Sequence, residues 1–183
     1  MRAKLKLLET YSGEMASLYT VMIEVSGSAI TTKLDQFIAK YRDTYRAEVM
    51  DIIRRLKSLG NSTGCTENFF KLDEGLDPND LVCALYDVPE INLRLYCIRL
   101  SDRITILGDG GPKLTRTWQQ DRNLEREVQA MMDVSRIIRT KIKNGNLRIS
   151  ADGLRLEGDL WIIRPPVQQK TDKKEDDDKE VVA

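Results

Sequence analysis

Hydrophobic residues recur every three or four positions in two stretches near the start of the chain. The first stretch is 30–41, and the second, 45–59, carries a single apolar stripe that Gly60 ends. Side chains at this spacing share one face of an α-helix, and glycine is favoured just beyond a helix C-terminus. The pattern predicts two antiparallel helices joined by a short link, with Asp43 or Thr44 as the cap of the second. Their apolar positions are Ile30, Leu34, Phe37, Ile38, Tyr41, Tyr45, Val49, Ile52, Ile53, Leu56 and Leu59.

From Phe69 the period changes, and short apolar runs alternate with polar turns. Two similar runs near the start, Ala3–Glu9 and Leu18–Val25, are each compatible with a strand. Runs of Val, Ile, Leu, Tyr and Phe are typical of β-strands, and Ser101-Asp102 marks a tight hairpin connection. The pattern predicts an antiparallel meander with the strand sequences FFKLDEG, LVCALYDV, LRLYCIRL and ITILGDG.

A third helix and a small hairpin are predicted next. Asp121 or Asn123 can cap a helix with one apolar face, which Gly145 ends. The Asp-Gly pair at 152–153 supplies the positive φ values of a two-residue turn, which predicts a hairpin. These elements together indicate an α+β fold in which two N-terminal helices pack on an antiparallel sheet, followed by a third helix and a small C-terminal hairpin.

The composition changes after Pro165-Pro166, where apolar residues become rare. Six acidic and four basic residues fill 170–180. A segment with so few apolar residues cannot offset the entropy that it loses on ordering. We therefore expect one folded domain over 1–164, which includes an additional N-terminal strand and the C-terminal hairpin, and a disordered charged tail over 165–183.

Charge and composition exclude several functions. The formal net charge is zero, so nucleic-acid binding has to come from a local patch. The absence of histidine excludes Ser-His-Asp and Cys-His nucleophiles and histidine-ligated zinc, and we expect neither metal nor cofactor. Three cysteines without a CxxC pair indicate reduced thiols. With no apolar run of roughly 20 residues and no signal peptide, we expect a cytoplasmic protein without a membrane partner.

The run GDGGPKLT at 108–115 does not match a nucleotide-binding phosphate loop. In that motif a second glycine stands five positions after the first, and Lys113 occupies this position. We reject nucleotide hydrolysis and interpret the glycines as a sharp exit from a strand, which leaves Lys113 at the strand's end beside the sheet surface.

The densest basic region covers the last two strands of the meander and the loop after them. Alternation along LRLYCIRL places Arg94, Tyr96 and Ile98 on one face of the sheet. Arg94 beside Tyr96 would combine a phosphate donor with a stacking or proton-handling group; alternatively, Arg94 pairs with a carboxylate and Tyr96 fills the edge of the core. The charged residues of this region are Arg94, Arg99, Arg103, Lys113 and Arg116, against Asp102 and Asp109.

Several of these segments resemble the RelE/ParE/HigB superfamily of bacterial toxins, as does the order of the elements. FFKLDEG is similar to the family segment in which a KL pair precedes an acidic-glycine turn, and LVCALYD takes the place of the next strand. LRLYCIRLSDRITILGDGGPK resembles the family's block of a YR pair, a hydrophobic hairpin, a loop and a lysine. The resemblance covers roughly Thr20 to Asn144 and implies a RelE-like fold.

The resemblance implies a toxin of a type II toxin–antitoxin system. Members typically cut messenger RNA in the ribosomal A site without metal, so the chain would be a ribosome-dependent mRNA interferase that a helix-turn-helix antitoxin neutralises. A non-catalytic binding or regulatory protein and a ParE-type gyrase inhibitor are the alternatives, since LVCALYD lacks the Arg or Lys of many members. The resemblance matches Arg94 and Lys113 to catalytic positions, and Tyr96 beside Arg94 is the third candidate catalytic residue. The candidate RNA-binding residues are Lys71 and Arg116, which also follow from the resemblance, and Arg99 and Arg103 of the basic region.

Overall fold

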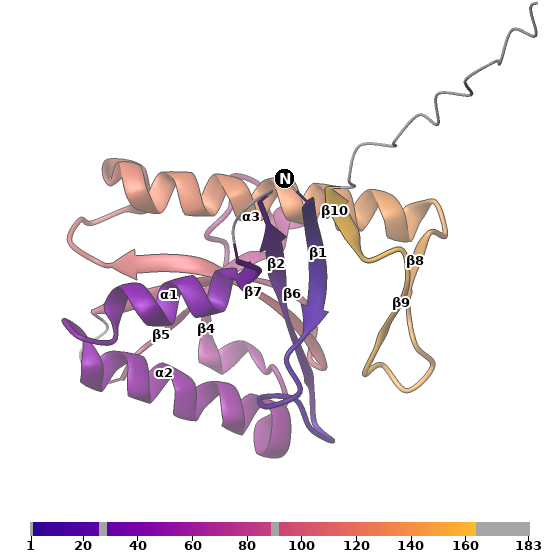
Figure 1. Cartoon of the computed structure of the whole chain (residues 1–183), viewed down its shortest axis with the longest axis horizontal. Coiled ribbons are helices and arrows are strands. Elements are labelled where there is room, and N and C mark those ends of the chain that lie inside the picture. Colours follow the sequence, from indigo (N-terminus) through magenta and orange to yellow (C-terminus); the bar gives the residue numbers. More distant parts are fainter. Residues whose placement is uncertain (1, 26–28, 89–91, 164–183) are drawn as a thin grey trace, which may run out of the picture.

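A computed structural model describes residues 2–25, 29–88 and 92–163, and the tail expected over 165–183 lies outside these ranges. Within them the fold is α+β. A twisted, mostly antiparallel sheet has one helix, α3, on one face and two helices, α1 and α2, on the other (Figure 1). The helices are α1 (Lys33–Tyr41), α2 (Arg46–Ser58) and α3 (Arg122–Lys143), with short helical turns η1 (Leu59–Thr63), η2 (Glu67–Phe69), η3 (Pro78–Asp80) and η4 (Trp118–Gln120).

The main sheet has the strand order β10-β1-β2-β7-β6-β5-β4, with β3 beside β2. The part from β4 to β7 is the predicted antiparallel meander, which is confirmed, and the two early runs are strands β1 and β2. The strands are β1 (Arg2–Leu7), β2 (Ser17–Glu24), β3 (Thr31–Thr32), β4 (Phe70–Lys71), β5 (Val82–Tyr86), β6 (Leu93–Ser101), β7 (Ile104–Pro112) and β10 (Trp161–Ile163).

Two features of the predicted arrangement are wrong. The chain begins with β1 and β2, so the two helices, although confirmed as α1 and α2, are not its first elements. The sheet is also not purely antiparallel, because residues 17–20 of β2 pair in parallel with residues 104–107 of β7. Parallel partners need a long connection, and here α1, α2 and strands β4 to β6 lie between them in the chain.

The helix starts differ in how they are capped. Asp121 caps α3, as predicted, by accepting hydrogen bonds from two backbone N–H groups of the first turn at 2.9 and 3.2 Å. For α2 the predicted caps Asp43 and Thr44 are wrong, since Tyr45 precedes the helix without a side-chain capping bond. The N–H of Tyr45 instead donates to the carbonyl of Tyr41 at 2.8 Å, which continues the hydrogen bonding from α1.

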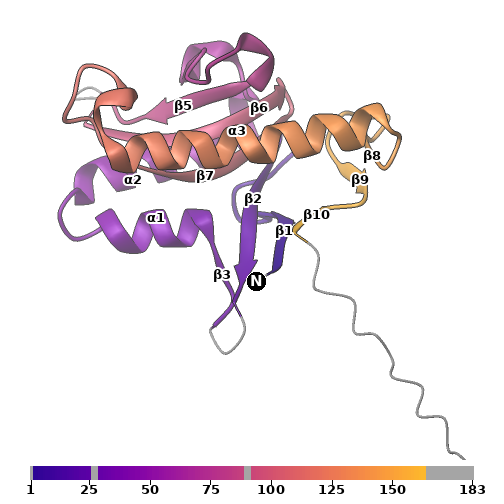
Figure 2. The ribbon, with the colours of Figure 1, turned by 90° about the horizontal axis from the view of Figure 1, so that it is seen from above.

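Helices cover both faces of the central strands. Alternation along β6 places Tyr96 and Ile98 in the core beneath α3, and Leu95 and Cys97 in the core against α1 and α2. Seen from above in Figure 2, α3 runs along β6 and β7, with which it is in contact. Gly108 of β7 permits this close approach, because a Cβ there would lie 2.4 Å from the Sδ of Met131. Neither face of β6 is therefore open to solvent at its centre.

The predicted C-terminal hairpin is confirmed as β8 (Leu147–Ile149) and β9 (Leu156–Gly158), but its two-residue turn is wrong. Residues 150–155 connect the strands, since two side chains bond to the backbone of a longer loop. Ser150 Oγ accepts from the N–H of Arg155 at 2.8 Å, and Asp152 Oδ1 accepts from the N–H of Leu154 at 2.9 Å. The chain then returns to the main sheet, where β10 pairs with β1. Among the described helices, none has the length and apolar character to cross a membrane.

Candidate functional site

Arg94 on β6 and Glu74, between β4 and β5, form a buried ion pair. The Nη1 of Arg94 lies 3.2 Å from Oε2 of Glu74 and 3.5 Å from Oε1, and the two side chains are 5% and 1% exposed. Lys71 on β4 contacts the same carboxylate and is itself half exposed. The structure thus brings Lys71 and Arg94 together, and of the two alternatives for Arg94 it contains the pairing with a carboxylate.

Tyr96 is fully buried beside this ion pair, beneath α3. Burial, with a contribution from the charge of Glu74, raises the pKa of its hydroxyl to about 12. Among the described residues, neither this hydroxyl nor the Nε of Arg94 makes a hydrogen bond of normal geometry, although the two side chains are close enough for Arg94 to oppose the rise in the pKa of Tyr96. A phenol with this pKa stays protonated at neutral pH, so Tyr96 offers a hydrogen-bond donor and not a general base.

Lys113 follows directly after β7, so its predicted place at the end of that strand is confirmed. The glycines before it are not a strand exit, however, because β7 continues through them to Pro112. They lie where neighbouring groups approach closely: a Cβ at Gly110 would be 1.8 Å from the carbonyl oxygen of Arg94. Lys113 and Arg116 are both exposed, and neither forms an ion pair with a residue that the structure describes.

Arg99 and Arg103 lie at the opposite end of β6, by the turn into β7. Arg99 forms an ion pair with Asp102, and its Nε donates to a backbone carbonyl at 2.7 Å. Arg103 is exposed and donates to the carbonyl of Asp152 at 3.3 Å. Along a strand, the distance from Arg94 to Arg99 is about 16 Å. The predicted residues therefore lie toward the two ends of β6 and form no single cationic patch. Arg99 and Arg103 are at one end, whereas Lys113, whose N–H donates to the carbonyl of Asn92 at 2.7 Å, lies toward the end that carries Arg94.

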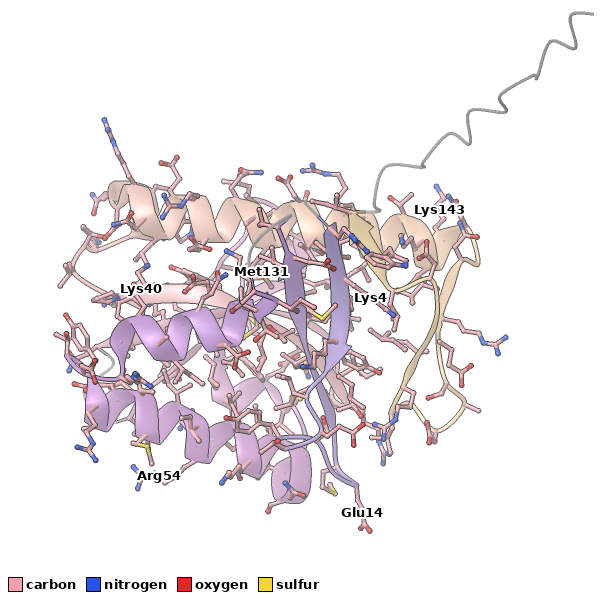
Figure 3. The ribbon with its side chains drawn as sticks, viewed as in Figure 1. Lys4, Glu14, Lys40, Arg54, Met131 and Lys143 are labelled. Atoms are coloured by element: carbon pink, nitrogen blue, oxygen red, sulfur yellow. The ribbon has the colours of Figure 1, made fainter. Side chains whose placement is uncertain are left out.

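A cluster of four charged side chains that the sequence patterns did not single out lies between α1, β7 and α3. It consists of Lys33, Lys40, Asp109 and Glu127, with 3.3 Å between Lys33 Nζ and Glu127 Oε2. Burial raises the pKa of Asp109, although the next backbone N–H opposes this, and the charge of Glu127 raises it further. Burial alone would lower the pKa of Lys40, which is labelled in Figure 3, but its tyrosine neighbour and the two carboxylates raise it.

The place of Asp109 depends on a β-bulge. The ladder between β6 and β7 shifts register so that Gly108 and Asp109 both lie opposite Tyr96. A bulge of this kind redirects a side chain. The feature of the sequence that could have indicated this bulge is an acidic residue within a run of glycines. The two lysines and two carboxylates balance in charge, and the exposed Arg126 adds a cation 3.4 Å from Glu127. The cluster can hold or exchange a proton at Asp109.

Metal binding and similarity to known proteins add no further site. Residues 2–25, 29–88 and 92–163 contain no group of three or more His, Cys, Asp or Glu side chains that could hold a metal ion. In comparisons with known proteins, no family model, no curated protein and no solved structure matches this chain.

Proposed function

We propose that the chain is a RelE-type protein of a toxin–antitoxin system that acts by binding a partner protein and does not cut RNA itself. Support for the family comes from the order α1, α2, β4, β5, β6, β7, α3, on which the resemblance rests, although β1 and β2 precede it. The expected partner is an antitoxin of the helix-turn-helix type, and the expected location is the cytoplasm.

The buried ion pair between Arg94 and Glu74 carries the non-cleaving part of this proposal. An arginine that stabilises a reacting phosphate has to present its guanidinium to the RNA, since its effect is electrostatic. Here the side chain of Arg94 is 5% exposed, and its guanidinium is already paired with the carboxylate of Glu74. Tyr96 is buried as well, with a raised pKa that keeps it protonated. Two of the three candidate catalytic residues thus pack as core residues.

A ribosome-dependent cleavage assay tests the proposal. The purified chain is added to translating ribosomes with a defined mRNA, and the 5′ ends of the RNA are mapped. We expect no new ends compared with a reaction that lacks the chain. We also expect a stable complex when the chain is co-expressed with the protein encoded by the adjacent gene. Specific new RNA ends would refute the non-cleaving role.

An mRNA interferase is the second candidate, because Lys113 and Arg116 are exposed and free of ion pairs with described residues. Both can approach an RNA phosphate without any change in the core. This candidate predicts RNA cleavage that falls at least about 100-fold in Lys113→Ala/Arg116→Ala. The matched control is Arg54→Ala/Lys57→Ala, which removes two exposed cations from α2 and should leave cleavage unchanged. Growth arrest with DNA damage and intact mRNA would instead identify a ParE-type gyrase inhibitor.

A further inference from the structure

A pocket of about 490 Å³ lies beside the C-terminal half of α3, where this helix meets the segment before β5, the end of β6 and strand β8. Part of its lining is apolar and accessible: Leu81 is 37% exposed, and Ile142 and Ile149 are each 38% exposed. Apolar side chains this exposed and this close together provide surface that a ligand can remove from water. The apolar lining residues are Leu81, Leu100, Ile142 and Ile149.

Three cations, Arg136, Arg139 and Lys143, line the same pocket. Arg136 forms an ion pair with Asp133 at 3.0 Å, and Arg139 interacts electrostatically with the exposed Asp77 without a direct ion pair. Lys143 forms no ion pair with a residue that the structure describes, so the three cations face two carboxylates. Lys143 lies in the last turn of α3, beside the β8–β9 hairpin (Figure 3), where the helix dipole favours a cation. Arg136 and Arg139 lie before that turn, so the dipole does not account for them. The pocket therefore combines unbalanced positive charge with accessible apolar surface.

We propose that this pocket binds the acidic segment 175–182 of the same chain, EDDDKEVV. The segment has five carboxylates and one lysine, followed by two valines. Its carboxylates complement the cations of the pocket, and its valines can cover the exposed leucine and isoleucine side chains. The pocket and the segment thus match in both charge and apolar character.

The segment can reach the pocket from the end of β10. Lys141 of α3 holds this strand, since its Nζ contacts the carbonyl oxygen of Trp161. At about 100° per residue, Lys141 faces the opposite side of α3 from Arg139 and Lys143. A helix with its side chains is about 10–12 Å across. Residues 164–174 can span up to about 35 Å, which is enough chain to pass around the helix.

Because the segment belongs to the same chain as the pocket, a weak intrinsic affinity is enough for it to occupy the pocket. The effective concentration of a segment joined by a short linker is of the order of 1 mM. If the isolated segment binds the pocket with a Kd of about 0.1 mM, the tethered segment would occupy the pocket in roughly 90% of molecules. A bound segment would compete with other acidic ligands for the pocket, and salt would weaken its binding by screening the charges.

Paramagnetic relaxation of backbone amides in the full chain tests the proposal. Lys179→Cys provides an attachment point for a nitroxide, because the three native cysteines are buried. We expect the relaxation enhancement at residues 136–143 and 149 to exceed that at residues 54–57 of α2 at least about fivefold, and to fall at least about threefold in 0.5 M salt.

Charge variants of the labelled chain distinguish binding in the pocket from nonspecific electrostatic attraction between the segment and the protein surface. Arg139→Glu/Lys143→Glu should abolish the enhancement at α3, and so should replacing the four acidic residues of 175–178 by their amides. The matched control is Arg54→Glu/Lys57→Glu, which reverses two exposed cations of α2 (Arg54 is labelled in Figure 3) and should leave the enhancement unchanged. The midpoint of thermal unfolding of each variant shows that it remains folded.

Three outcomes would overturn the proposal. The first is an enhancement that is no stronger at α3 than at α2. The second is an enhancement that survives both the reversal in the pocket and the neutralisation of 175–178. The third is an enhancement that also appears when nitroxide-labelled chain is mixed with unlabelled, isotope-enriched chain, since the segment would then bind a second copy.

Discussion

Removal of the Glu74 carboxylate tests whether its ion pair with Arg94 is part of the core. Two unit charges 3.2 Å apart attract each other by about 5 kcal/mol at an effective dielectric constant of about 20. This attraction offsets the cost of burying both groups. Glu74→Ala would leave Arg94 buried without its partner, so we expect the free energy of unfolding to fall by about 3–5 kcal/mol.

Urea unfolding at pH 7, followed by circular dichroism, measures this loss. With a denaturant slope of about 1–3 kcal/mol per M, the midpoint should fall by at least about 1 M. Arg94→Leu/Glu74→Leu removes both charges and should recover most of the stability, because no buried charge is left unpaired. As a control, Glu157→Ala breaks the exposed pair between Glu157 and Arg148, and should cost less than about 1 kcal/mol.

A loss below about 1 kcal/mol in Glu74→Ala would refute this reasoning. It would mean that the guanidinium of Arg94 reaches water with little rearrangement, and that Arg94 is available to an RNA phosphate. The same result would therefore remove the main support for the non-cleaving role. A double variant as unstable as Glu74→Ala would also contradict the argument, since the loss would then come from shape and not from charge.

Three further substitutions test the packing of this region by urea unfolding. Burial raises the pKa of Asp109 above 3.8, so its contribution to stability is complete below that pH and is lost as the pH rises through its pKa in the folded state. The free energy of unfolding of Asp109→Asn, relative to that of the parent chain, should therefore rise between pH 4 and pH 7. The same difference between variant and parent at both pH values would contradict this. Tyr96→Phe removes a buried hydroxyl that lies beside Arg94 without a hydrogen bond of normal geometry, and should leave stability unchanged or raise it by up to about 1 kcal/mol. A clear loss would indicate that the hydroxyl bonds to Arg94. Gly110→Ala places a Cβ 1.8 Å from the carbonyl oxygen of Arg94 and should cost about 3 kcal/mol, which a parent-like midpoint would disprove.

The elements that sequence patterns predicted correctly are defined by residues close together in the chain. Each of α1, α2 and α3 has an apolar face that repeats over several turns, and β4 to β7 join neighbours in sequence. The N-cap of α3 is equally local, since Asp121 bonds to residues two and three positions ahead. In these segments, the side chains that stabilise an element are also the ones whose pattern predicts it.

Pairings between distant strands depend on information that no single segment carries. The parallel contact between β2 and β7 joins residues 17–20 to 104–107, and β10 closes the sheet by pairing with β1 at the other end of the chain. Alternation shows which face of a strand a residue occupies, but not which strand lies beside it. The loop of the hairpin between β8 and β9 is a smaller case, because side-chain hydrogen bonds favoured a longer connection over the Asp-Gly turn.

The same limit applies to the candidate site. Alternation correctly placed Arg94 and Tyr96 on one face of β6, but that face is closed by a helix that begins only at Arg122. The carboxylate that pairs with Arg94 comes from 20 residues earlier in the chain, so a count of charges within the strand omits it. In a chain with a formal charge of zero, a basic segment indicates anion binding only where its cations outnumber the carboxylates around them in space. Arg94 offers no such site because its guanidinium is buried against Glu74, although Lys71 contacts the same carboxylate. Beside Arg139 and Lys143, where we place the acidic segment, the cations are exposed, and with Arg136 they outnumber the nearby carboxylates of Asp133 and Asp77.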